Sequence, residues 1–366
     1  MEKQTFKMNG SNGTSVPPSN GHSAFGDILM VFVGYIAPVC YIQGIVGNAG
    51  SLYIFIRSRK LRHKDVLDYL LPLCVADLIL LVFGAMVTWL HLDMPSAIGG
   101  ADNIRTNILS TPASCKILSY LGWVGGFSAS WIIALFTFER VVSVSISHTI
   151  MWLTRRKRLI AIALVALLSI LILIPVLVTY DIDDDGYSIE CEYRYKESQG
   201  TISFLGPFLL FFVIYLLPVF LVCIGNGIII WALMAKRKRD DPTDPVDLER
   251  QDREMKVIKQ LLVISMLYLV CVIPAAALDL IKFQFDMQKS DPDNDLLYAA
   301  YDFVNRLIYM NNSFNYVAYI LTLDWFRREV KSICCPTRVN VDYNEMTEEA
   351  FAIVRGQNYG GAYSRM

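Results

Sequence analysis

The stretch CKILSYLGWVGGFSASWIIALFTFER (residues 115–140) decides the fold of this chain. No charged residue lies between Lys116 and Glu139, and as an α-helix rising ~1.5 Å per residue the stretch extends roughly 37 Å. This length exceeds the hydrocarbon core of a bilayer, which is about 30 Å thick. The stretch therefore predicts a membrane-spanning helix that places Cys115 and Arg140 at opposite membrane faces.

The overall composition agrees with a membrane protein. Of the 366 residues, 54% are hydrophobic and 18% are charged, whereas soluble domains average about 25% charged residues. Eight cysteines in a chain of this length do not form a disulfide framework. Because there is no glycine-rich phosphate loop, no metal-spaced Cys/His set and no nucleophile elbow, we expect no enzymatic activity, no cofactor and no nucleic-acid partner.

Six further apolar segments have spanning length, which predicts an all-α bundle of seven transmembrane helices. The seven predicted spans cover residues 28–56, 66–90, 112–138, 159–180, 202–235, 257–281 and 300–323. Basic clusters at 57–64, 155–158 and 236–239 alternate along the chain with acidic segments such as 181–185. Because basic loops stay on the cytoplasmic side, we expect the N-terminus outside and the C-terminus inside.

The chain divides into a bundle and two polar tails. Residues 1–27 are rich in Asn, Gly, Ser and Pro and predict a disordered extracellular tail, with glycosylation sequons at Asn9 and Asn12. The bundle is predicted to occupy residues 28–335, together with an amphipathic interfacial helix in LDWFRREVKSICC (323–335) that contacts membrane lipid. Residues 336–366 predict a cytoplasmic tail.

Polar residues inside the predicted spans are costly and therefore informative. Asn48 lies in the first span, Asp77 in the middle of the second, and Asn311, Asn312 and Asn315 in the seventh. We expect Asp77 to meet Asn48, Asn311 and Asn315 in a hydrated cluster whose oxygen atoms suit a sodium ion.

Seven landmarks in family-like order give the chain a specific resemblance. These are Gly47-Asn48, Ala76-Asp77, Cys115, Glu139-Arg140, Pro218, Cys271-Val-Ile-Pro274 and Asn315-Tyr-Val-Ala-Tyr319. Residues 28–335 resemble the rhodopsin-like (class A) G-protein-coupled receptors, and the helix-seven motif is similar to that of neuropeptide receptors, including invertebrate FMRFamide and myosuppressin receptors. Several positions depart from the family pattern: Ala129, Val141, Asn226, Val272 and Tyr316.

The resemblance implies specific roles for individual residues. Cys115 is expected to pair with Cys191, and both lie on the predicted outer side. Glu139, Arg140 and Glu254 are expected to form an inner lock that releases when helix six opens around Pro274, with Asn315 and Tyr319 taking part. The implied partners are a heterotrimeric G protein and arrestin at the plasma membrane. Cys334 and Cys335 are candidate palmitoylation sites.

The ligand class follows from what the outer half contains. An amine receptor carries an Asp in helix three where this chain has Gly122, and an opsin needs a helix-seven lysine, which is missing from residues 303–323. The outer halves instead carry aromatic and acidic residues: Trp89, Trp123, Glu190, Glu192, Asp279, Tyr301, Asp302 and Tyr309. An acidic rim steers cations, so we expect a short cationic, amidated peptide. A chemosensory receptor for a small molecule and a seven-span transporter or channel remain as alternatives.

Overall fold

The computed structural model describes most of the hydrophobic part of the chain. The described residues are 28–29, 31–58, 65–93, 111–145, 154–184, 189–193, 212–237, 245–285 and 295–334. The predicted sequons at Asn9 and Asn12, the residue Cys335 and both predicted tails lie outside these residues.

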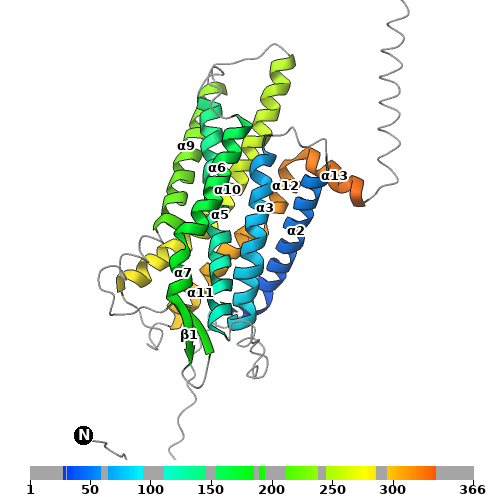
Figure 1. The fold of residues 1–366 in the computed structure, drawn as a ribbon. Coiled ribbons are helices and arrows are strands. Elements are labelled where there is room, and N and C mark those ends of the chain that lie inside the picture. Colours follow the sequence, from blue (N-terminus) through cyan, green and yellow to red (C-terminus); the bar gives the residue numbers. More distant parts are fainter. Residues whose placement is uncertain are drawn as a thin grey trace, which may run out of the picture.

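Within the described residues the fold is a bundle of long helices with one two-stranded sheet (Figure 1). The first half contains η1 (Phe32–Ile36), α2 (Ala37–Arg57), α3 (Leu67–Ile79), η3 (Leu80–Met86), η4 (Trp89–Asp93), α5 (Pro112–Ser145), α6 (Arg155–Ile172) and α7 (Ile174–Thr179). The second half contains β1 (Tyr180–Asp184), β2 (Ile189–Tyr193), η8 (Phe212–Leu216), α9 (Leu217–Arg237), α10 (Pro245–Phe285), α11 (Asp295–Ser313), α12 (Asn315–Thr322) and α13 (Asp324–Cys334). The η elements are π-helical turns that continue the neighbouring helices.

Six runs in the described residues are long and apolar enough to cross a membrane. They are Phe32–Arg57, Leu67–His91, Pro112–Val144, Arg155–Thr179, Phe212–Ala235 and Met255–Leu278. Each overlaps one of the first six predicted spans. The seventh predicted span corresponds to α11 and α12, which are separate helices with a break at Phe314 and carry Asp302, Arg306 and several asparagines.

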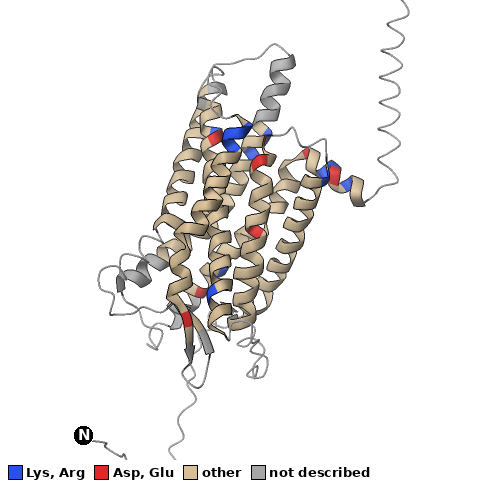
Figure 2. Cartoon of the chain, in the orientation of Figure 1, with Lys and Arg blue, Asp and Glu red and all other residues tan. Residues whose placement is uncertain are grey.

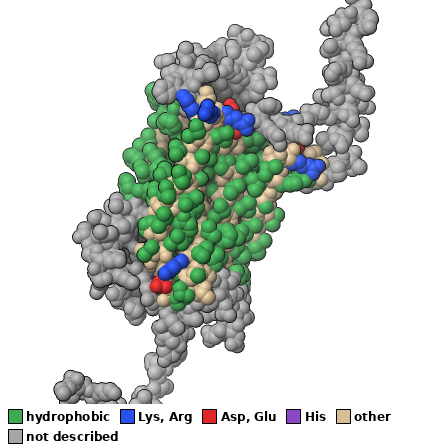
Figure 3. All heavy atoms as spheres, in the orientation of Figure 1, with side chains coloured by type: hydrophobic (Ala, Val, Ile, Leu, Met, Phe, Trp, Pro, Cys, Tyr) green, Lys and Arg blue, Asp and Glu red, His purple; other side chains and the backbone are tan. Residues whose placement is uncertain are grey.

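The outer surface of the bundle suits lipid. Large apolar side chains such as Val39, Val178 and Trp231 are more than half exposed, at 63%, 75% and 69%. Figure 3 shows hydrophobic side chains covering the middle of the visible face, and Figure 2 shows that charged residues gather toward the two ends of the helices. A continuous apolar surface of this kind is stable in hydrocarbon but not in water.

The helix α5 holds the centre of the bundle, where it contacts α3, α6, α9 and α10. Two glycines permit close approaches between α5 and its neighbours. A Cβ at Gly125 would lie 2.6 Å from the backbone nitrogen of Leu80, and one at Gly225 would lie 2.5 Å from Cγ2 of Thr137. Larger side chains at these positions would push η3 and α9 away from α5.

The two strands form an antiparallel hairpin in which Ile182 pairs with Cys191, as the alternating sequence predicts. The hairpin lies at the opposite end of the bundle from α13 (Figure 1). We call these two ends the hairpin end and the Arg140 end. The helix α13 is amphipathic as predicted, with Phe326 buried and Arg328 and Lys331 exposed.

Candidate functional site

A cavity of about 390 Å³ opens at the hairpin end of the bundle. Side chains from η3, α5, α10 and α11 form its walls, and Tyr180 and Cys191 of the hairpin contribute to its lining. Gly122 stands in the wall, where a Cβ would lie 3.0 Å from Cα of Gly84. The small residues keep α5 close to η3 and leave room in the cavity.

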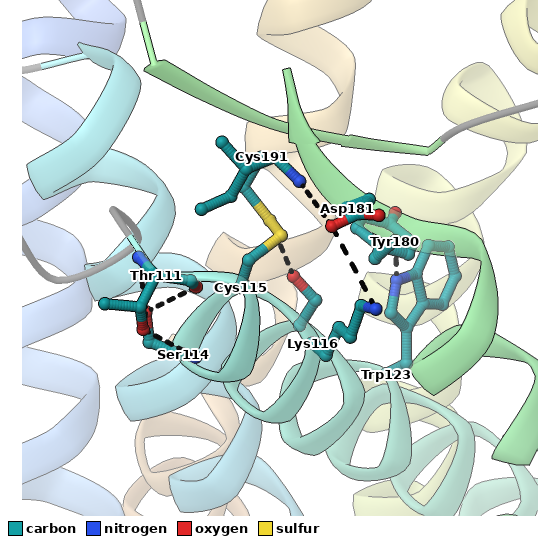
Figure 4. The surroundings of a disulfide bond; sticks show 10 residues. Thr111, Ser114, Cys115, Lys116, Trp123, Tyr180, Asp181 and Cys191 are labelled. Atoms are coloured by element: carbon teal, nitrogen blue, oxygen red, sulfur yellow. Dashed lines mark hydrogen bonds and ion pairs between the residues drawn. A yellow bond between two sulfur atoms is a disulfide. The ribbon is translucent and has the colours of Figure 1, made fainter. Parts of the chain in front are cut away.

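A disulfide fixes the hairpin to α5. Cys115 and Cys191 are bonded with a Cα–Cα distance of 5.6 Å, which confirms the predicted pair (Figure 4). Nearby, Nε1 of Trp123 donates a hydrogen bond of 3.2 Å to the hydroxyl of Tyr180, and the Lys116 ammonium lies 4.0 Å from Asp181. The roof of the cavity is therefore held by covalent, polar and ionic contacts with a single helix.

Four of the predicted ligand residues line the cavity: Trp123, Tyr301, Asp302 and Tyr309. Trp89 does not. Its Nε1 donates a hydrogen bond of 2.9 Å to the carbonyl of Gly34, so the ring ties η4 to η1. The side chains of Asp279, Glu190 and Glu192 lie outside the described part of the structure.

Two basic cavity residues were missed by the sequence reasoning. Arg306 and His91 both line the cavity, and each is only 7% exposed. Arg306 lies four residues after Asp302, about one turn further along α11. The signal that was available is the spacing, since Asp302, Arg306 and Tyr309 fall on one face of a helix.

The predicted polar cluster forms in part. Nδ2 of Asn315 donates a hydrogen bond of 2.7 Å to Oδ2 of the fully buried Asp77. Asn48 does not bond Asp77, however, because its Nδ2 donates to the carbonyls of Gly44 and Asn312, both at 3.0 Å. Packing of α2 against α11 aims Asn48 at these carbonyls.

Four buried side-chain oxygens near these helices accept no hydrogen bond within the described residues. They are Oδ1 of Asn48, Asp77, Asn311 and Asn315. Oxygens of this type are what a small hard cation takes as ligands, and Ala129 supplies none. The residues are therefore compatible with the sodium ion expected from the sequence, which stays a prediction.

The seventh predicted span is broken between α11 and α12. The motif of the resembled family has a proline at this point, which Tyr316 replaces in this chain. Phe314 separates α11 from α12, with φ −99° and ψ 0°. Tyr316, in the place of that proline, packs on Gly47, where an added Cβ would lie only 2.2 Å from the ring. Tyr319 is fully buried and lies 4.0 Å from Sγ of Cys74, so the predicted motif residues face the bundle interior.

At the Arg140 end, the predicted contact between Arg140 and Glu139 is present at 3.3 Å. The Arg140 guanidinium also lies 5.5 Å from the ring centroid of Phe136, and its side chain is 12% exposed. The side chain of Glu254 lies outside the described residues, so its predicted contact with Arg140 stays a prediction.

A buried ion cluster surrounds Glu139. Arg158 of α6 is 5% exposed and donates two hydrogen bonds of 3.1 Å to Asp68, while its Nη1 lies 3.6 Å from Glu139. Asp65 also contacts Arg158, and Arg155 lies 3.3 Å from the second oxygen of Asp68. The basic residues 155–158 were expected only to keep their loop on the cytoplasmic side, but in the structure Arg155 and Arg158 join α6 to α3 and α5.

Two further contacts hold α10 at this end. The Lys256 ammonium lies 3.0 Å from Asp324 at the start of α13, and this contact lowers the pKa of the Asp324 carboxyl below its ordinary value. A lowered pKa keeps Asp324 ionised, so the pair weakens only as the pH falls below the usual aspartate range. Nδ2 of Asn226 donates a hydrogen bond of 2.7 Å to Oγ of Ser265, and this bond links α9 to α10.

The cavity at one end, the Glu139-Arg140 pair at the other and the polar cluster between them define a class of protein. The sequence profile of the family described as "7 transmembrane receptor (rhodopsin family)" matches residues 47–319. The chain belongs to this family of rhodopsin-like G-protein-coupled receptors. The matched range includes α11 and α12, which places the seventh helical segment within the family fold.

Three curated relatives show where the similarity lies. Somatostatin receptor type 5 of Bos taurus is 24% identical over 318 residues, which cover 82% of this chain and 76% of that receptor. Galanin receptor 2b of Danio rerio is 21% identical over 304 residues, covering 83% and 75% of the two chains. C-C chemokine receptor type 8 of Mus musculus is 25% identical over 172 residues, covering 46% and 44%.

Proposed function

We propose that this receptor lies in the plasma membrane with its hairpin end outside and is activated by a short peptide that carries a cationic side chain. The observation that carries the proposal is the roofed cavity, which is lined by Trp123, Tyr301, Tyr309 and Asp302. The similarity to receptors named for somatostatin and galanin supports a peptide ligand. The narrower likeness to invertebrate FMRFamide and myosuppressin receptors, and the amidated end, stay predictions.

Signalling is proposed to proceed by a shift between two bundle arrangements. In the resting arrangement Arg140 pairs with Glu139, Lys256 pairs with Asp324, and Asn226 joins α9 to α10. Movement of α10 around Pro274, which lacks a backbone donor, would break the last two contacts and open a cleft beside Arg140. A heterotrimeric G protein, and after it arrestin, would bind this cleft. No enzymatic step is proposed.

A peptide screen tests this function. The full-length receptor in membranes, with a heterotrimeric G protein, is exposed to a library of short peptides and to a library of volatile small molecules while guanine-nucleotide exchange is measured. We expect exchange in response to peptides. A response to volatiles alone would favour the chemosensory alternative, and solute flux in liposomes without exchange would favour a transporter or channel.

We expect Lys256→Ala to raise ligand-independent nucleotide exchange about twofold to fivefold, because an exposed ion pair contributes modestly to the resting arrangement. Asp324→Lys should act in the same direction, and the exchanged pair Lys256→Asp with Asp324→Lys should restore low activity. Lys259→Ala, an exposed lysine on the same helix, is the matched control. Equal activity of the Lys256 and Lys259 variants at matched surface expression would contradict the proposed restraint. Glu254→Ala tests the expected partner of Arg140 in the same assay.

Asp302→Asn should reduce the potency of a cationic peptide agonist by about 30-fold or more, because a bound peptide would cover this exposed carboxylate and removing one partner of the charge contact buried in this way costs roughly 2–5 kcal/mol. Replacing the peptide Arg by citrulline should cause an equal loss, with no further loss in Asp302→Asn. Glu329→Gln is the control, because this carboxylate lies in α13 at the opposite end of the bundle and does not line the cavity. If Asp302→Asn keeps full potency, Asp279, Glu190 and Glu192 are tested in the same way. Full potency in all four would show that the acidic mouth does not bind the peptide.

A further inference from the structure

The charged residues of the cavity are ordered by depth. Among the lining residues that the structure describes, Asp302 and Arg306 are the only ones that are Asp, Glu, Lys or Arg. The helix α11 runs from the hairpin end toward the Arg140 end (Figure 1). Arg306 therefore lies one helical turn, or about 6 Å, deeper than Asp302. Asp302 is exposed, whereas Arg306 is 7% exposed.

This order distinguishes the two ends of a peptide. A protonated N-terminus placed deep in the cavity would meet the positive charge of Arg306 in a region of low dielectric, where repulsion is strong. A C-terminal carboxylate or carboxamide presents carbonyl-type oxygens instead. A guanidinium has several N–H donors in a planar fork and accepts no hydrogen bonds, so it can bind such oxygens while keeping a contact with a neighbouring residue.

The rest of the deep wall suits the same end group. Beyond Arg306 the cavity is lined by Tyr309, Asn311 and Asn312 from α11. Asn312 donates its amide to the carbonyl of Ile308. His91, also 7% exposed, lies in η4 at the hairpin end of the run Leu67–His91 and adds a second basic side chain to the outer part of the lining. The deep half of the cavity thus combines aromatic surface with hydrogen-bond donors and contains no described carboxylate.

We propose that the peptide enters with its C-terminus first and that Arg306 binds the terminal oxygen, while the cationic side chain of the peptide stays one turn higher at Asp302. This inference rests on the proposed peptide ligand and adds to it an orientation and a residue that determines specificity. The recognised group is a terminal carbonyl-type oxygen, supplied either by a free carboxylate or by a carboxamide.

The test uses a pool of synthetic pentapeptides that contain one Arg and end in Phe. The pool is made in four forms: the free acid, the carboxamide, the N-acetylated carboxamide, and a form with phenethylamine in place of Phe. The last form lacks the terminal carbonyl. Binding to purified full-length receptor is measured as the shift of its unfolding temperature with peptide concentration, and nucleotide exchange is measured in parallel. The variants are Arg306→Gln, Arg306→Lys and the control Arg328→Gln, an exposed arginine of α13.

We expect the wild-type receptor to bind the acid or the carboxamide about 10–100-fold more tightly than the phenethylamine form, as for a hydrogen bond to a charged group. The better of the two identifies the source of the oxygen. N-acetylation should change affinity little. Arg306→Gln should abolish the preference for a terminal carbonyl, Arg306→Lys should keep part of it, and Arg328→Gln should keep it all. If Arg306→Gln does not fold, the comparison of peptide forms on wild type still tests the orientation of the peptide, and Arg306→Lys still tests the role of Arg306.

Equal binding of the phenethylamine form, loss of binding on N-acetylation, or an unchanged preference in folded Arg306→Gln would overturn the inference. Each of these outcomes leaves the peptide function standing, because a peptide still binds. The absence of a response to any form, in both the unfolding and the exchange measurements, would overturn the peptide function and this inference together.

Discussion

Replacing Arg158 by Met should destabilise the receptor by about 3–5 kcal/mol, because it removes the buried cation that the two buried carboxylates Asp68 and Glu139 share. The side chains of Arg158, Asp68 and Glu139 are only 5%, 7% and 9% exposed. Arg158 bonds Asp68 through both Nε and Nη2 at 3.1 Å and lies 3.6 Å from Glu139. The expected result is a lower unfolding temperature of the solubilised receptor and much less receptor at the cell surface.

Two further variants separate charge from geometry in this cluster. Arg158→Lys should recover only part of the stability, since an ammonium cannot reproduce the two guanidinium bonds to Asp68. Arg158→Met combined with Asp68→Asn should be more stable than Arg158→Met alone, because one buried uncompensated charge is removed. Both results would assign the effect to charge pairing rather than to lost packing volume.

The control is Arg155→Met. Arg155 contacts the same carboxylate at 3.3 Å, but its side chain is 63% exposed. An exposed ion pair contributes no more than about 1 kcal/mol. If Arg158→Met and Arg155→Met proved equally stable, the cluster would be a surface feature and the buried-charge argument would be wrong.

Replacing Cys115 or Cys191 by Ser should remove about 2–5 kcal/mol of stability and loosen the hairpin over the cavity mouth, where the Trp123–Tyr180 and Lys116–Asp181 contacts would still hold it. The two cysteines are 76 positions apart in the sequence, and closure of a loop of that size restricts the unfolded chain strongly. We expect low surface expression and loss of peptide binding in both single variants. The double variant should resemble either single one, because the same bond is lost.

Cys40→Ser serves as the control for the thiol chemistry, since Cys40 is a free cysteine of α2. It should leave expression and binding near wild type. The disulfide itself is measured by alkylation of the native receptor with and without reductant. Ready alkylation of Cys115 in unreduced wild type, together with normal peptide binding in both single variants, would contradict the prediction.

The sequence by itself determined the features that depend on runs of residues along one segment. Apolar stretches of bilayer length predicted the six spanning runs found among the described residues, because helix rise and membrane thickness fix the required length. Alternation around Cys191 predicted the hairpin, and the apolar and basic faces of residues 323–335 predicted the amphipathic helix α13. The motif residues Cys115, Glu139-Arg140 and Asn315 identified the family that the comparison shows.

Only the tertiary structure decided how each helix is rotated and which neighbour it meets. Arg158 and Asp68 are 90 positions apart, and nothing in either segment indicates that they bond. Trp89 reaches the carbonyl of Gly34 instead of the cavity, and Asn48 reaches Asn312 instead of Asp77. The physical reason is that the rotation of a helix about its axis is set by side-chain packing against distant segments. Small residues such as Gly122 and Gly225 set how close those segments come, and this packing also places Arg306 inside the cavity.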